Sequence, residues 1–203
     1  MKVISAISTE FALQEEIIYL NHAAVSPWPK RTVEVVKQFA EQNGYQGSLA
    51  YPRWLETEAR LRERLACLIN AASADDIALV KNTSEALSFI AYGLNWRSGD
   101  NVVSSNQEFP SNRIVWESLA PHGVELRQAD LSSHDSPEDA LFALVDERTR
   151  LIAISSVQYA SGLRIDLARI GKFCRSHGIL FCVDAIQSIG AVRFDVLAMQ
   201  ADF

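Results

Sequence analysis

One aspartate follows an apolar run near the end of the chain. Asp184 comes directly after residues 179–183, Ile-Leu-Phe-Cys-Val, a run typical of a strand that is buried on both faces. A carboxylate at such a strand end is costly to desolvate unless it meets a cation or a donor, and the protonated ring nitrogen of a bound cofactor would serve. The alternative is structural, because an aspartate at this place also caps the following turn.

A second polar group opens a helix. Thr83 and Ser84 follow the apolar residues 77–80 and precede a helical pattern that begins at Ala86. Free backbone N–H groups and two hydroxyls at a helix start can hold a phosphate. The alternative is a capping box, since Asn82 is followed three residues later by a glutamate.

Two further junctions carry residues that suit a flat ligand. Phe109 follows the apolar run 101–105, where its ring could stack on a ligand or belong to the core. Gln158 lies in the stretch 155–162, which leaves another apolar run and is rich in donors without charge. That stretch can equally be a surface turn.

Neither the histidines nor the cysteines are spaced to bind a metal, so we expect no metal site. These residues are His22, His122, His134, His177, Cys67, Cys174 and Cys182. Three scattered cysteines also do not form a disulfide framework, which favours a reducing, cytoplasmic location. The N-terminus lacks the pattern of a secretory signal, and no stretch approaches the ~18 apolar residues of a membrane span.

Apolar periodicity divides the chain into a helical part and an alternating part. Helical spacing over 29–43 and 53–70 predicts an N-terminal helical segment, residues 1–70. Five short β-rich runs then alternate with helix-length segments, which predicts an α/β domain over 71–203 with a mainly parallel sheet. The predicted strands are 76–80, 101–105, 124–128, 151–155 and 179–183, and helix-start signals lie at Ser136-Pro137 and Asp166, with Gly178 as a stop.

Composition is that of a globular protein with an acidic balance. The 203 residues hold 19 Lys and Arg against 25 Asp and Glu, a formal charge of −6, with 48% hydrophobic residues. This balance argues against binding nucleic acid through bulk positive charge. The sequence also lacks the Gly-x-Gly-x-x-Gly and P-loop motifs of nucleotide-binding α/β domains.

These blocks, in this order, resemble the aminotransferase class V family of fold type I pyridoxal 5′-phosphate enzymes, which includes cysteine desulfurases and isopenicillin N epimerase-like proteins. The resemblance runs from about Tyr19 to Phe203 and is most specific over residues 181–190, Phe-Cys-Val-Asp-Ala-Ile-Gln-Ser-Ile-Gly, followed by Asp195 and the final Ala-Asp-Phe. It implies a three-layer large domain, pyridoxal 5′-phosphate as cofactor, an amino acid as substrate and a homodimer.

The resemblance also implies roles for single residues. Asp184 would keep the pyridine nitrogen protonated, Gln187 would donate to the phenolic oxygen, and Thr83 and Ser84 would hold the phosphate. Phe109 falls where desulfurases usually carry a stacked histidine, which favours the epimerase-like branch. Gln158 falls where the family often contacts the ring or the substrate carboxylate. Asn21, His22 and Ala23 resemble the segment on the substrate side.

The family's Schiff-base lysine follows the position of Asp202-Phe203 by a few residues, and none of the five lysines here matches it. We therefore expect a truncated chain, inactive alone, that lacks the C-terminal small domain and whose strand 76–80 has lost its neighbour and leaves an open edge. The reaction of the intact relative, whether transamination, epimerisation or desulfuration, stays open. The alternative function is a catalytically dead cofactor-binding or assembly module.

Overall fold

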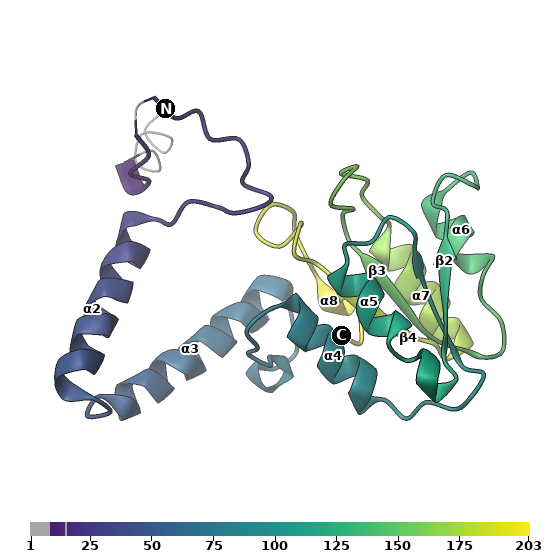
Figure 1. The fold of residues 1–203 in the computed structure, drawn as a ribbon, viewed down its shortest axis with the longest axis horizontal. Helices are drawn as coiled ribbons and strands as arrows, with labels where there is room; N and C mark the ends of the chain where they lie inside the picture. Colours follow the sequence, from purple (N-terminus) through teal and green to yellow (C-terminus); the bar gives the residue numbers. More distant parts are fainter. Residues whose placement is uncertain (1–8, 15) are drawn as a thin grey trace. The chain divides into compact units, whose positions relative to one another are not determined.

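The computed structural model describes residues 9–14 and 16–203 (Figure 1). The chain divides into two compact units, up to Ala59 and from Arg60 onward. The boundary falls inside helix α3, Tyr51–Ile69. Within the described residues, no helix is both long and apolar enough to span a membrane.

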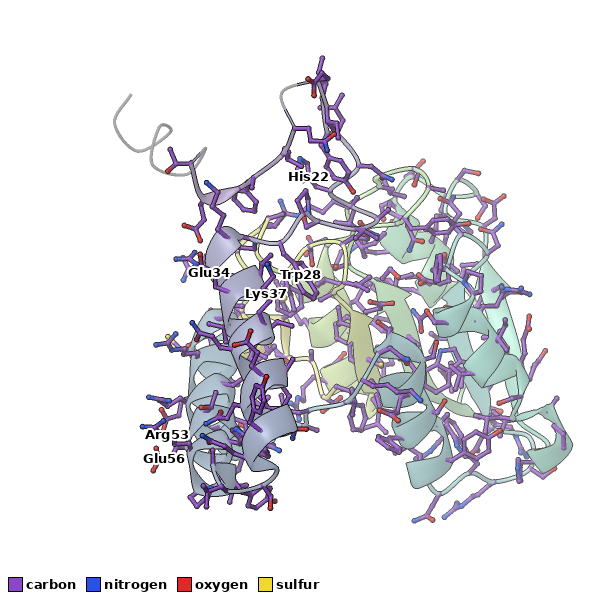
Figure 2. The ribbon with its side chains drawn as sticks, turned by 60° about the vertical axis from the view of Figure 1, so that its left-hand side comes forward. His22, Trp28, Glu34, Lys37, Arg53 and Glu56 are labelled. Carbon is purple, nitrogen blue, oxygen red and sulfur yellow. The ribbon has the colours of Figure 1, made fainter. Side chains whose placement is uncertain are left out.

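The first unit holds helix α2, Lys30–Gln46, and the start of α3. Helix α2 ends at Gly47, whose positive φ of 54° suits glycine. The Phe39 and Trp54 rings lie 5.3 Å apart and join the two helices. Trp28 and two charged side chains of α2, Glu34 and Lys37, help to line a pocket of about 310 Å³ (Figure 2). The predicted helices over 29–43 and 53–70 are thus confirmed within a few residues.

The second unit contains a parallel four-stranded sheet. Its strands are β1 (Asn101–Ser105), β2 (Glu125–Ala129), β3 (Thr149–Ser155) and β4 (Leu180–Asp184), in the order β2-β1-β3-β4. Four of the five predicted strands are therefore confirmed, 101–105 without change and the other three with boundaries shifted by at most two residues. The helices are α4 (Thr83–Gly93), α5 (Ser111–Glu117), α6 (Pro137–Phe142), α7 (Leu167–His177) and α8 (Val196–Met199), with short 3₁₀ turns at Ala74–Asp76 and Ala120–His122.

Helices cover both faces of this sheet, because successive strand residues point to opposite sides. Leu151 and Ala153 of β3 pack in one cluster with Leu87 of α4 and Trp116 of α5. Ile152 and Ile154 pack on the other face with residues of α6 and α7. The result is the predicted α/β architecture in three layers (Figure 1).

The local helix signals are also confirmed. Ser136 caps α6, with Pro137 as its first residue, and its hydroxyl accepts from the Asp139 N–H at 3.2 Å. Asp166 caps α7 by accepting from the Arg169 N–H at 3.1 Å. Gly178 ends α7 with a φ of 68°.

The predicted strand 76–80 is wrong. Asp76 ends a 3₁₀ turn, and residues 77–80 form no strand, although Ile77 has extended backbone angles. A strand exists through hydrogen bonds to a neighbour, and in the described part of the chain no strand pairs with this run. Leu79 and Val80 are 39% and 37% exposed, so the apolar run marks an unpaired segment and not a core strand.

Candidate functional site

The carboxyl ends of β3 and β4 bring the first site residues together. The two strands run parallel, and Ser155, the last residue of β3, pairs in register with Asp184, the last residue of β4. Parallel strands joined by helices end at the same edge of the sheet, so the segments that leave these strands start side by side. Glu108 and Gln158 reach this edge from the loops after β1 and β3.

Asp184 is a buried carboxyl without a cation partner. It is 7% exposed, and its Oδ1 accepts from the Ile186 N–H at 3.0 Å. Burial raises the pKa of Asp184, the Ile186 N–H opposes this, and the negative charge of Glu108 raises it further. Among the described residues, no Lys, Arg or His forms an ion pair with it. Asp184 therefore caps the turn through Oδ1, and in the described part of the chain its Oδ2 accepts no hydrogen bond.

The start of helix α4 combines a cap with unused donors. Asn82 Oδ1 accepts from the Glu85 N–H at 2.9 Å, and the Glu85 carboxylate accepts from the Lys81 N–H at 2.8 Å. The capping alternative is therefore confirmed in large part. The N–H groups and hydroxyls of Thr83 and Ser84 make no hydrogen bond within the described part of the chain, so the helix start keeps donors for an anion.

Phe109 is half-exposed beside a second aromatic ring. Its side chain is 49% exposed and meets Tyr159 edge to face, with ring centroids 5.2 Å apart at 86°. Pro110 follows as the cap residue of α5. Tyr159 thus covers part of the Phe109 side chain, and about half of that side chain stays exposed.

Glu108 is the main site residue that the sequence did not single out. It is 5% exposed, and its Oε1 accepts from the Ser155 N–H at 2.9 Å and the Gln158 Nε2 at 2.7 Å. Its Oε2 accepts from Asn112 Nδ2 at 2.9 Å and from the Ser155 hydroxyl. The only signal in the sequence is its position directly before Phe109.

Gln158 itself is internal, whereas residues 159–161, directly after it, form the exposed turn that the alternative expected. It is 1% exposed, and its Nε2 is used by Glu108. Its Oε1 has no partner in the described part of the chain. Gln187 follows Asp184 by three residues and is partly buried. The cofactor contacts predicted for Gln158 and Gln187 stay predictions.

The predicted substrate-side residues belong to the first unit. Within that unit the His22 ring lies 5.1 Å from the Tyr19 ring, edge on, and the Asn21 carbonyl accepts from the Val25 N–H at 3.3 Å. Their predicted role toward the substrate remains a prediction.

The three cysteines are free, and two of them are buried. Cys174 and Cys182 are buried free thiols, and burial raises the pKa of each to about 12, so neither is a nucleophile at neutral pH. Cys67 is exposed on α3. Among the described residues, no group of three His, Cys, Asp or Glu could hold a metal.

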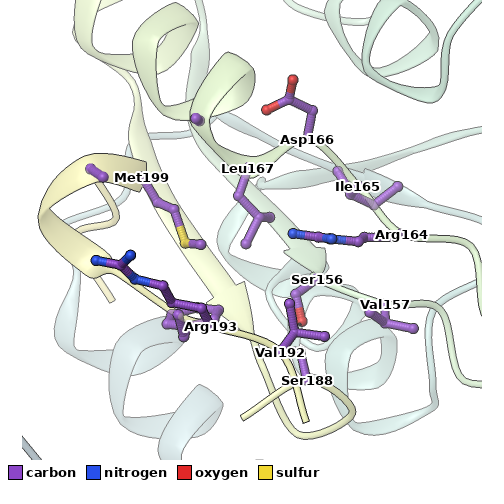
Figure 3. Close-up of a pocket in the computed structure, with 13 residues that line it drawn as sticks. Ser156, Val157, Arg164, Ile165, Asp166, Leu167, Ser188, Val192, Arg193 and Met199 are labelled. Carbon is purple, nitrogen blue, oxygen red and sulfur yellow. Dashed lines mark hydrogen bonds between the residues drawn. The ribbon is translucent and has the colours of Figure 1, made fainter. Parts of the chain in front are cut away.

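A separate pocket lies between the start of α7 and the segment that contains α8. It has a volume of about 480 Å³, with Arg164 and Arg193 on its walls and Ser156 and Ser188 among its lining (Figure 3). The two serine hydroxyls lie 2.7 Å apart. This pocket contains none of the predicted site residues.

Comparison with known proteins points to one family. The aminotransferase class-V model matches residues 18–203. A probable cysteine desulfurase of Methanothermobacter thermautotrophicus is 39% identical, over 96% of this chain and 50% of its own length. A cysteine desulfurase of Escherichia coli is 30% identical, over 92% of this chain and 48% of its own length.

The fold has close structural neighbours as well. The crystal structure of the cysteine desulfurase CsdA from Escherichia coli aligns with a TM-score of 0.85 at 27% identity, over 98% of this chain and 52% of that one. The apo structure of a cysteine desulfurase from Thermococcus onnurineus NA1 aligns with a TM-score of 0.81 at 26% identity, over 98% of this chain and 51% of that one. The chain spans about half the length of the relatives it matches.

Proposed function

The chain belongs to the aminotransferase class-V family, and on that premise we propose that it forms the pyridoxal 5′-phosphate site of an enzyme that acts on a small amino acid. One observation carries this proposal. Asp184 is a buried carboxyl at the end of β4, and in the described structure no protein cation lies beside it. Such a group is costly unless a ligand supplies the positive charge.

The candidate site residues have the chemistry to hold the cofactor. A pyridinium nitrogen would supply the cation that Asp184 lacks. The N–H groups of Thr83 and Ser84 match a phosphate, since α4 has eleven residues and its first-turn donors are unused. The exposed part of the Phe109 ring suits a flat heterocycle. Gln187 follows Asp184 closely enough along the chain to be the donor to the phenolic oxygen.

The chemistry assigned to the chain is electrostatic and positional. When bound, pyridoxal 5′-phosphate supplies an electron sink for the pair released at the α-carbon of an amino acid. Asp184, ionised, would hold a proton on the ring nitrogen and so keep that sink effective. The start of α4 would fix the phosphate end, and Phe109 would fix the plane of the ring and exclude water from one face.

The reaction of the longer protein is a further part of the proposal. The relatives named above are cysteine desulfurases, which supports a cysteine-like substrate. Phe109 cannot transfer a proton as histidine can, so proton transfer at this position would need another group, which leaves transamination and epimerisation as the competing reactions. Exposed Leu79 and Val80 support association of two copies as a homodimer.

We also propose that these 203 residues bind the cofactor without a covalent bond and do not turn over substrate alone. In the unit from Arg60 onward the lysines are Lys81 and Lys172. Lys172 lies on α7, and Lys81 pairs with Glu85 at 3.9 Å. The Lys81 side chain is 75% exposed, so we expect it to stay in solvent and to form no bond with the cofactor.

The test is a titration of the purified chain with pyridoxal 5′-phosphate, followed by absorbance and circular dichroism, and then borohydride reduction with mass analysis. We expect saturable binding with an induced dichroic band and no reduced adduct. Pyridoxal, which lacks the phosphate, serves as the matched probe and should bind more weakly. Absence of saturable binding would refute the cofactor site, and an adduct at Lys81 would refute the non-covalent mode.

A further inference from the structure

The Glu108 carboxylate receives four hydrogen bonds and donates none. The donors are the N–H and hydroxyl of Ser155, Nε2 of Gln158 and Nδ2 of Asn112. In this arrangement the two oxygens of Glu108 act only as acceptors, two hydrogen bonds to each, which compensates for the burial of the carboxylate.

The orientation of one donor to Glu108, the Asn112 amide, is fixed by a further hydrogen bond. Trp116 Nε1 donates to Asn112 Oδ1 at 3.0 Å, which leaves the Asn112 amide nitrogen to donate to Glu108. The orientation of Asn112 is thus fixed by the indole of Trp116, a side chain that is fully buried in α5. Asn112 can therefore only donate to Glu108, and the Glu108 oxygen accepts at that position.

This carboxylate joins three elements of the candidate site. Asn112 belongs to α5, Ser155 ends β3, and Gln158 belongs to the loop after β3. Phe109 is the next residue after Glu108, and Ser155 pairs in register with Asp184. Fixing Glu108 therefore fixes the backbone of the stacking ring and the strand beside the ring-nitrogen partner.

Glu108 and Asp184 also form a buried acidic pair without a protein cation. Both are at most 7% exposed, and no ion pair involves either of them in the described part of the chain. The negative charge of Glu108 raises the pKa of Asp184, and both acids raise the pKa of the Cys182 thiol, whose burial is the larger cause. A cationic ring bound beside Asp184 would therefore also be attracted by the charge of Glu108.

We propose that Glu108 is a positioning residue for the cofactor ring, which orders Phe109 and the ends of β1 and β3 and adds a second negative charge beside Asp184. This inference rests on the proposed cofactor site. Glu108 acts through its neighbours, because it lies inside the protein and its four acceptor positions are occupied.

Glu108→Gln tests the proposal. The new amide would place its own hydrogens against donors of Ser155, Gln158 or Asn112, and it removes one negative charge. We expect the dissociation constant for pyridoxal 5′-phosphate to rise about tenfold or more, as loss of one hydrogen bond to a charged group would produce. The induced dichroic band should change, and the acid limb of the affinity profile should move to lower pH, because Asp184 loses its negative neighbour.

Glu138→Gln is the matched control. Glu138 is also 5% exposed and also accepts from a backbone N–H, that of Asp166 at 2.8 Å, but it lies on α6 with Arg169 at 3.7 Å. This variant should keep the wild-type affinity, dichroic band and pH profile. Equal losses of affinity in the two variants would show that Glu108 has only a general structural role, and they would overturn the proposal.

Glu108→Asp decides the matter if Glu108→Gln does not fold. It keeps the charge but shortens the reach to the donors, so we expect affinity between those of the wild type and the glutamine variant. Wild-type affinity with an unchanged dichroic band in either folded Glu108 variant would overturn the proposal. Failure of the wild-type chain to bind pyridoxal 5′-phosphate would instead overturn the proposed function, so the two failures are distinguishable.

Discussion

Replacing Asp184 by asparagine should stabilise the free chain and weaken cofactor binding at the same time. Asparagine has nearly the same shape and can still accept from the Ile186 N–H, which now donates to Asp184 at 3.0 Å. The substitution therefore removes a charge and little else. A residue that served only to cap the turn would not produce two effects of opposite sign.

The stability effect follows from the raised pKa of Asp184. Ionisation of Asp184 is less favourable in the folded chain than in the unfolded chain. The free energy of unfolding therefore falls as the pH rises above the ordinary pKa near 3.8, and this loss is constant above the folded pKa. Asp184→Asn should therefore melt at a higher temperature than the wild type at neutral pH. The difference should vanish below the ordinary carboxyl pKa, where the aspartate is neutral in both states.

The binding effect follows from the lost charge-assisted hydrogen bond to the ring nitrogen. Hydrogen bonds to charged groups contribute about 1.5–3 kcal/mol, which corresponds to a rise of about 10- to 150-fold in the dissociation constant. In the wild type, affinity should also fall as the pH drops through the folded pKa of Asp184, because a neutral acid no longer pairs with the pyridinium. The asparagine variant should lack that acid limb.

Thermal unfolding across pH and titration with pyridoxal 5′-phosphate measure both effects. Asp195→Asn is the control, because the Ala198 N–H lowers the pKa of Asp195. The ionised Asp195 carboxylate therefore stabilises the folded chain above its unfolded pKa, and this stabilisation is lost as the pH falls. That variant should be no more stable than the wild type and should bind normally. An Asp184→Asn chain that is less stable at neutral pH, or that binds as tightly as the wild type, would refute the reasoning.

Two other substitutions test the architecture and the phosphate end of the site. Gly171→Ala should lower the free energy of unfolding by about 1–3 kcal/mol or more, because the new Cβ would lie 1.8 Å from the Met199 carbonyl oxygen. Gly93→Ala is the control, since its Cβ would lie in open space and should be tolerated. Equal melting temperatures of the two variants would contradict this prediction. Asn82→Asp keeps the cap of α4 but places a negative charge at the proposed phosphate position. Affinity for pyridoxal 5′-phosphate should therefore fall about tenfold, whereas affinity for pyridoxal should not change. An equal fall for both compounds would disprove the phosphate assignment.

The fold was predictable where the signal is local or where burial is continuous. Six of the seven residues of β3 are buried, and four of them, residues 151–154, form an unbroken apolar run. The caps at Ser136 and Asp166 depend on residues three positions away, so the sequence contains both partners. The run at 77–80 has the same apolar character, but a strand also needs a neighbour, and local sequence does not contain that information.

The site was predictable only in part for the same reason. Asp184 follows an apolar run, and its burial could be expected from position alone. Glu108 is recognisable only when Ser155 and Gln158, nearly fifty residues later in the sequence, are placed against it. A polar residue in a loop after a strand has no periodicity to indicate that it is buried. Gln158 was placed at the site, but its internal position depends on the same long-range contact.

Asp184 and Glu108 share a property that argues for a ligand more strongly than any motif does. Each places negative charge inside the protein, and in the described structure neither has a cation to offset it. Four hydrogen-bond donors offset the burial of the Glu108 charge, whereas Asp184 has one donor. Most of the uncompensated cost of desolvation therefore lies at Asp184. A folded chain gains nothing from that arrangement on its own. Since asparagine would form the same turn, we propose that the acid serves a positive group that binds there, whose charge would offset this energetic cost on binding.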